Sequence, residues 1–161
     1  MRSLLFLAAF FIALASTTAA AVAIPAPMSE SELLSRSELV GLIRILSVTC
    51  TKVTKDERTG EELPSYSAKA ELMYVTKGDE TLGDDIKLSF HAIPTGVLGP
   101  WTVFYYPGEM VWTHLVKQEG AYTTTWWNGK GRIISKAIIT ELPTTPGETV
   151  EVPRRNAQSR N

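Results

Sequence analysis

The sequence predicts a mainly β domain with antiparallel strands and one short helix near its start. Apolar and polar residues alternate through residues 65–76 and 85–91 with the period of two that is typical of a half-buried strand. Turn-forming pairs such as Lys-Gly, Pro-Gly and Asn-Gly stand between the apolar segments. Helix-start signals are concentrated in one stretch, residues 28–33. Together these observations favour short strands joined by turns.

The helix start is the most detailed local signal. Ser29 and Glu32 have the spacing of a capping box, and Met28 and Leu33 occupy the positions of a hydrophobic staple. We expect a short helix that ends near Ser37.

Six strands are expected after the helix. The first covers residues 39–51, which are rich in Leu, Ile and Val. The others follow from alternation or from turn boundaries, over residues 65–76, 85–91, 110–117, 122–127 and 131–140. The charged segment 54–64 is expected to be the exposed tip of a hairpin.

The connection 92–108 is unusual in length and composition. It contains three prolines and three glycines, together with Trp101, Tyr105 and Tyr106. Connections of this length are usually functional or disordered, and this one is too aromatic to be simply disordered. The prolines after Leu142 predict a disordered tail over residues 142–161.

The first 23 residues have the organisation of a secretory signal peptide. A basic start precedes an uncharged apolar run over residues 4–14, and residues 21–23 fit the small-x-small cleavage rule. We expect cleavage after Ala23, with Ala20 and Ala21 as alternatives, and a secreted or periplasmic product. The apolar run is shorter than the roughly 20 residues of a membrane-spanning helix, so no stable span is expected after cleavage, and an uncleaved anchor is the alternative. The expected divisions are a signal peptide (1–23), a β domain (24–141) and the tail (142–161).

The pair Trp126-Trp127 precedes Asn128-Gly129, which is the strongest short signal for a hairpin turn. A two-residue or a four-residue loop places Trp126 on an uncharged face, with Tyr122 and Ile133, and directs it to the core. Trp127 then lies outside, where Arg132 can stack on it or a ligand can contact it. A three-residue loop with a bulge reverses this assignment.

Composition excludes several classes of function. The formal net charge is -1 at pH 7, and a nucleic-acid-binding protein usually has a basic surplus, so no nucleic-acid partner is expected. Cys50 is the only cysteine, so no intrachain disulfide can form, and we expect it to be a buried strand residue. His91 and His114 are far apart and no metal-binding motif occurs, so no metal and no cofactor are expected.

Four segments carry a resemblance to a known family: "SESELLSRS", "ELVGLIRILSV", a strand that ends in "VTKG", and "PGEMVWTHL". Over about Ser29 to Ile139 they look like the netrin-like barrel of exported proteins, of which the tissue inhibitors of metalloproteinases are the best-known members. The resemblance implies an antiparallel OB-like barrel. In the inhibitors the N-terminal cysteine of the mature chain chelates the zinc of the protease. This chain has no cysteine near Ile24 and no disulfides, so the resemblance supports the barrel and not the inhibitory mechanism.

Two classes of function remain. The first is a non-enzymatic binding or protein-interaction module for an unknown protein or a cell-envelope ligand. Its candidate ligand-binding residues are Trp127, Arg132, Trp101, Tyr105 and Tyr106. The alternative is a secreted hydrolase that uses His91 or His114 with a carboxylate such as Glu109. If His91 and His114 met an acid in a pocket, the enzyme would be favoured.

Overall fold

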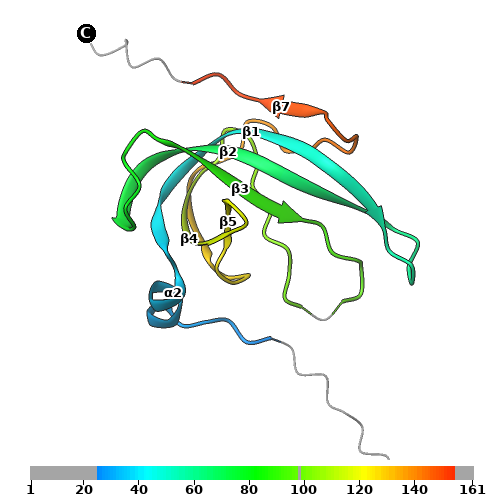
Figure 1. Ribbon diagram of the computed structural model, residues 1–161, viewed down its shortest axis with the longest axis horizontal. Helices are drawn as coiled ribbons and strands as arrows, with labels where there is room; N and C mark the ends of the chain where they lie inside the picture. Colours follow the sequence, from blue (N-terminus) through cyan, green and yellow to red (C-terminus); the bar gives the residue numbers. More distant parts are fainter. Residues whose placement is uncertain (1–24, 98, 155–161) are drawn as a thin grey trace, which may run out of the picture.

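The computed structural model of the protein describes residues 25–97 and 99–154, so the expected signal peptide lies outside the described residues. Its elements are α2 (Glu30–Arg36), β1 (Leu39–Lys55), β2 (Glu62–Lys77), β3 (Asp85–His91), β4 (Met110–Gln118), β5 (Ala121–Thr124), β6 (Lys130–Ser135) and β7 (Thr149–Glu151). The strands form one seven-stranded sheet, in which five close into a barrel-like ring in the order β1-β2-β3-β5-β4 and back to β1 (Figure 1). The prediction of a mainly β, barrel-like fold with a short N-terminal helix is confirmed.

The helix α2 forms as the capping box predicts. The backbone N–H of Ser29 donates to Glu32 Oε2 at 2.9 Å, and the Glu32 N–H donates to Ser29 Oγ at 3.3 Å. The hydrogen bonds from the Ser29 backbone and side chain lower the pKa of the Glu32 carboxyl. The helix ends at Arg36 because Ser37 is extended, and the Ser37 hydroxyl donates to the carbonyl oxygen of Leu33 at 2.6 Å.

The long strand β1 closes the ring. It pairs with β2 from Val40↔Lys77 to Lys55↔Glu62, and the opposite edge of its first half pairs with β4. Four register shifts along the β1–β2 ladder bend and twist the two strands. At Gly41 a Cβ would collide with the carbonyl oxygen of Tyr74, so glycine allows the close approach of the two strands there.

The seam between β3 and β5 is much weaker than the β1–β2 ladder. β3 pairs with β2 along its whole length but meets β5 at one parallel bridge, Leu88↔Tyr122. The ring is therefore antiparallel everywhere except at this seam.

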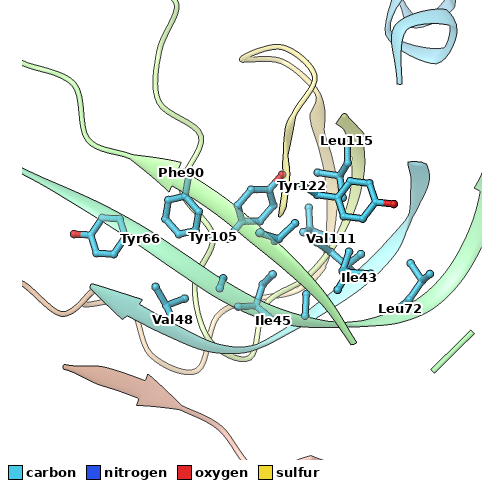
Figure 2. Close-up of a cluster of buried hydrophobic side chains, with 14 of the residues drawn as sticks. Ile43, Ile45, Val48, Tyr66, Leu72, Phe90, Tyr105, Val111, Leu115 and Tyr122 are labelled. Carbon is cyan, nitrogen blue, oxygen red and sulfur yellow. The ribbon is translucent and has the colours of Figure 1, made fainter. Parts of the chain in front are cut away.

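Side chains from all five ring strands fill the inside of the ring (Figure 2). The labelled members of this core are Ile43, Ile45, Val48, Tyr66, Leu72, Phe90, Tyr105, Val111, Leu115 and Tyr122. Burial alternates along β3 as predicted, with Ile86, Leu88 and Phe90 inside. Cys50 is fully buried on β1, as predicted, and burial raises the pKa of its thiol.

The predicted hairpin between residues 122–127 and 131–140 is wrong. β5 pairs with β4 along Leu115–Gln118, and β6 pairs with β4 along Met110–Thr113. Residues Leu39–Arg44 of β1 pair with one edge of β4. β5 and β6 therefore both pair with the opposite edge of β4, one after the other. The two segments run in the same direction, as one interrupted strand.

The chain does turn at Asn128-Gly129, but the turn lies in the short loop between β5 and β6. This loop is a side excursion, after which the chain continues in the direction of β5. The Gly129 N–H donates to the carbonyl oxygen of Trp126 at 2.8 Å, which closes a four-residue turn. The chain leaves and returns at the same residue of β4, because Thr125 N–H donates to the oxygen of His114 and His114 N–H donates to the oxygen of Gly129. A Cβ at Gly129 would lie 3.0 Å from the Trp126 oxygen, so the glycine serves close packing and not a left-handed backbone.

The expectation of a disordered tail over residues 142–161 is wrong for its described part, residues 142–154. β7 pairs with β1 from Ser47↔Glu151 to Thr49↔Thr149, and Val152 is buried. A three-residue strand between Gly147 and Pro153 is too short to produce a recognisable alternation. Residues 155–161 of the expected tail lie outside the described part of the chain.

No helix within residues 25–97 and 99–154 has the length and apolar character needed to cross a membrane.

Candidate functional site

A pocket of about 390 Å³ lies where the β3–β5 seam opens. We call it the aromatic pocket. It is lined by residues 89–91, by residues 93–94, 97 and 99–103 of the connection to β4, by Gln118 and by residues 123–127. Its volume lies within the range of about 300–1,000 Å³ that is typical of small-molecule sites.

Two tryptophans from distant segments meet in the aromatic pocket. The ring centroids of Trp101 and Trp127 are 4.7 Å apart, and the ring planes are at 90°. Such an edge-to-face pair contributes about 0.5–1.5 kcal/mol beyond the burial of its area. Trp101 remains 49% exposed, so one large aromatic surface is available to a ligand.

Among the described residues, the wall of the aromatic pocket carries no lysine, arginine, aspartate or glutamate. His91, which is exposed at the end of β3, is the only ionisable side chain that these residues contribute to it. Burial of an unpaired charge is costly, so this wall favours an uncharged ligand.

Two buried polar atoms at the aromatic pocket lack a hydrogen-bond partner within the described residues. They are the hydroxyl oxygen of Thr102 and the indole nitrogen of Trp127. Buried polar groups are nearly always paired, and an unpaired one costs about 1–3 kcal/mol.

The N-terminal segment 25–28 runs along the edge of the aromatic pocket. The indole N–H of Trp126 donates to the carbonyl oxygen of Ala26 at 3.0 Å. Asn128 makes two hydrogen bonds with the backbone of Met28, at 2.8 Å and 3.2 Å. These contacts hold the turn that presents the tryptophans.

The predicted faces of the two tryptophans are also wrong. Trp126 is half-buried against segment 25–28 and does not lie in the core. Trp127 is half-buried against Trp101, and Ile133, expected inside, is 50% exposed. Trp126 and Trp127 lie in the side excursion. Residues there do not pair with β4, so their side chains do not follow the alternation of a strand.

Of the five candidate ligand-binding residues, the structure brings only Trp101 and Trp127 together in the aromatic pocket. Arg132 is exposed on β6. Tyr105 lies in the core, where its hydroxyl is hydrogen-bonded to Thr113 and burial raises its pKa to about 12.

Tyr106 belongs to a cluster around a buried ion pair. The Lys130 ammonium lies 2.8 Å from Glu109 Oε1 and donates to the oxygen of Phe104 at 2.7 Å. It also lies 5.1 Å from the centre of the Tyr105 ring and 5.7 Å from that of Tyr106. The cation–π contact expected between Arg132 and Trp127 is not found among the described residues. Lys130 instead contacts two tyrosine rings, and its contacts fix the end of the connection to β6.

The two histidines lie in different environments. His91 lines the aromatic pocket, and His114 is buried with its Nε2 3.2 Å from Glu30 Oε1. His114 Nδ1 is 3.5 Å from the hydroxyl of Ser37, which is already engaged with Leu33. Among the described residues no three His, Cys, Asp or Glu side chains form a group that could hold a metal ion.

The sequence did not single out Thr102, Thr123 or Thr125 as members of a site, although all three line the aromatic pocket. Thr102 carries no sequence signal of its own. The alternation expected over residues 122–127 places Thr123 and Thr125 on the same outward face as Trp127, and that direction was the available signal.

No protein-family model, no curated protein and no solved structure matches the chain. Its function therefore has to be argued from the pocket itself.

Proposed function

We propose that the chain is an exported, non-enzymatic binding module that holds an uncharged ligand in the aromatic pocket. The observation that carries the proposal is the chemistry of the pocket wall. Its described residues combine Trp101, Trp126 and Trp127 with hydroxyl groups, and His91 is the one acid or base among them. Aromatic walls with a few convergent polar groups are the usual composition of a small-molecule site.

Secretion or transport to the periplasm belongs to the same proposal, and its support is the signal-peptide pattern of residues 1–23. The netrin-like relationship is likewise proposed, supported by the five-stranded ring behind a short helix. Metalloproteinase inhibition is not part of the proposal, because the only cysteine is buried in β1.

Titration of the tryptophan fluorescence tests the proposal. The probes are uncharged, namely a neutral oligosaccharide, a Pro/Ala-rich peptide and an alkyl glycoside, and each is paired with a charged analogue of similar size. We expect a saturable change with an uncharged probe and a weaker one with its charged analogue, because the wall offers no counter-charge.

Two variants assign that binding to the aromatic pocket. Trp101→Ala should remove it, whereas Arg132→Ala on exposed β6 is the matched control and should keep it. Tighter binding of the charged analogues, or binding that survives Trp101→Ala and is lost in Arg132→Ala, would contradict the proposal.

A further inference from the structure

A second pocket adjoins the aromatic pocket on the outer face of the sheet. It has a volume of about 670 Å³, and we call it the polar pocket. Ser89, Gln118 and Thr123 belong to the walls of both pockets. The two pockets are therefore neighbouring parts of one elongated site.

The elongated site follows the β3–β5 seam. Ser89 and Thr123 directly follow the single bridge Leu88↔Tyr122, where the two strands separate. Because the side chains of a strand alternate, Lys87, Ser89 and His91 form one outward row along β3. This row leads from the polar pocket, which includes Lys87, to the aromatic pocket, which includes His91.

The polar pocket differs from the aromatic pocket in its chemistry. It presents hydroxyl and amide groups from Thr51, Ser67, Ser89, Gln118 and Thr123. Its two charged side chains, Lys87 and Glu119, have opposite signs and leave no net charge. One end of the site thus suits an apolar ring face, and the other suits a ligand with many hydroxyl groups.

We infer that the ligand is a neutral oligosaccharide of two or more units that lies across both pockets. This inference rests on the proposed function and names the class of ligand. A sugar ring has an apolar face of C–H groups, which can stack on Trp101, and a rim of hydroxyl groups, which can pair with Ser89 and Gln118. Strand faces with flanking loops are where OB-like barrels bind extended ligands.

Two features of the elongated site separate this ligand from others. A nucleic acid needs a track of cations for its phosphates, and Lys87 is the only lysine or arginine that the described part of the chain contributes to the two walls. An acyl chain would leave the hydroxyl and amide groups of the polar pocket without partners.

Calorimetry and tryptophan fluorescence with neutral glucose, mannose and N-acetylglucosamine oligomers, from the monosaccharide to the hexasaccharide, test the inference. In at least one series we expect affinity to rise about tenfold or more from the monosaccharide to the trisaccharide. A rise of this size is what about two additional hydrogen bonds would contribute. The uncharged Pro/Ala-rich peptide and the alkyl glycoside are the comparison probes.

Variants separate the two halves of the site. Ser67→Ala, at a residue that lines the polar pocket and not the aromatic pocket, should reduce the gain with length, and Trp101→Ala should weaken every sugar, including the monosaccharide. Lys136→Ala, on an exposed side chain after β6, is the control and should change neither. Thermal melts of each variant check that the fold is kept.

The outcomes distinguish this inference from the proposed function. Binding of the peptide or of the alkyl chain without any saccharide would overturn the oligosaccharide and leave the uncharged-ligand pocket standing. Affinity that does not depend on sugar length, or a gain with length that Ser67→Ala leaves unchanged, would overturn the two-pocket arrangement. If no uncharged probe bound at all, the proposed function would fail with it.

Discussion

The connection between β3 and β4 has two halves that behave differently. The described residues of its first half, 92–97 and 99–103, are exposed or half-buried, and eight of them line the aromatic pocket. In its second half, residues 104–109, Tyr105 packs in the core and Glu109 is paired with Lys130. The backbone of this half is also tied to β1, because Ile45 N–H donates to the Glu109 oxygen and Gly108 N–H donates to the Ile45 oxygen.

The difference explains how one aromatic-rich connection can serve both the fold and a site. Aromatic residues that are fixed by buried hydrogen bonds and an ion pair hold the connection in place. Trp101 precedes this anchored half by a few residues and is therefore displayed from a fixed base. Loops that carry binding residues are commonly positioned by a rigid scaffold in this way.

The largest expected effect is on the anchored half. Lys130→Met should cost about 3–5 kcal/mol, because it leaves the carboxylate of Glu109 buried without its partner. Denaturant unfolding measures this cost, and the exposed Lys136→Met is the control. The double variant Lys130→Met/Glu109→Leu should recover part of the loss. If the Lys130→Met protein were as stable as the Lys136→Met control, the ion pair between Lys130 and Glu109 would not be what anchors this half.

An intermediate effect is expected from alkali, also on the anchored half. The pKa of Tyr105 rises from 10.0 to about 12 in the fold because of burial. A folded-state pKa above the unfolded one gives stability that is complete below pH 10 and is lost as pH rises from 10 towards 12. The loss should be on the order of 2–3 kcal/mol.

Unfolding curves between pH 9 and about 12, compared with those of Tyr105→Phe, measure this alkaline loss. The variant should lose less stability across the range, although some dependence remains because burial raises the pKa of Tyr66 and Tyr122 as well. Equal pH dependence in both proteins would show that Tyr105 does not stay protonated in the fold.

The smallest effect on stability is expected in the first half. Trp101→Ala should cost only about 0.5–1.5 kcal/mol, the contribution of its edge-to-face contact with Trp127, since half of its surface is already exposed. Thermal and denaturant unfolding measure it. If Trp101→Ala destabilised the protein as much as Lys130→Met does, both halves of the connection would anchor the fold, and they would not differ in the way described.

Sequence reasoning was most reliable where the signal is local. The capping box at Ser29 and the alternation of β3 depend on neighbouring residues, and the structure confirms both. The bounds of β3, residues 85–91, are those that the alternation predicts. Burial of Cys50 also follows from its position in an apolar run.

The errors arose where distant residues decide. Asn128-Gly129 forms a turn, but the turn alone does not decide whether the chain reverses direction. That depends on His114, whose backbone oxygen accepts from Thr125 N–H and whose N–H donates to the oxygen of Gly129. The pairing of β7 with β1 is equally long-range. Only part of the aromatic pocket could be predicted. The sequence marks Trp101 and Trp127 as candidate ligand-binding residues, but the contact between them depends on the fold.

The hydrogen bonds of segment 25–28 have a practical consequence for how the protein is handled. Pro25 lies against Gly99, which lines the aromatic pocket, so anything fused ahead of it emerges at the rim of the site. In Figure 1 the two ends of the described chain leave on opposite sides of the molecule. An affinity tag or a sensor-chip linkage placed after Arg154 therefore leaves the pocket open to solvent, and one placed before Pro25 competes with the analyte for the same space.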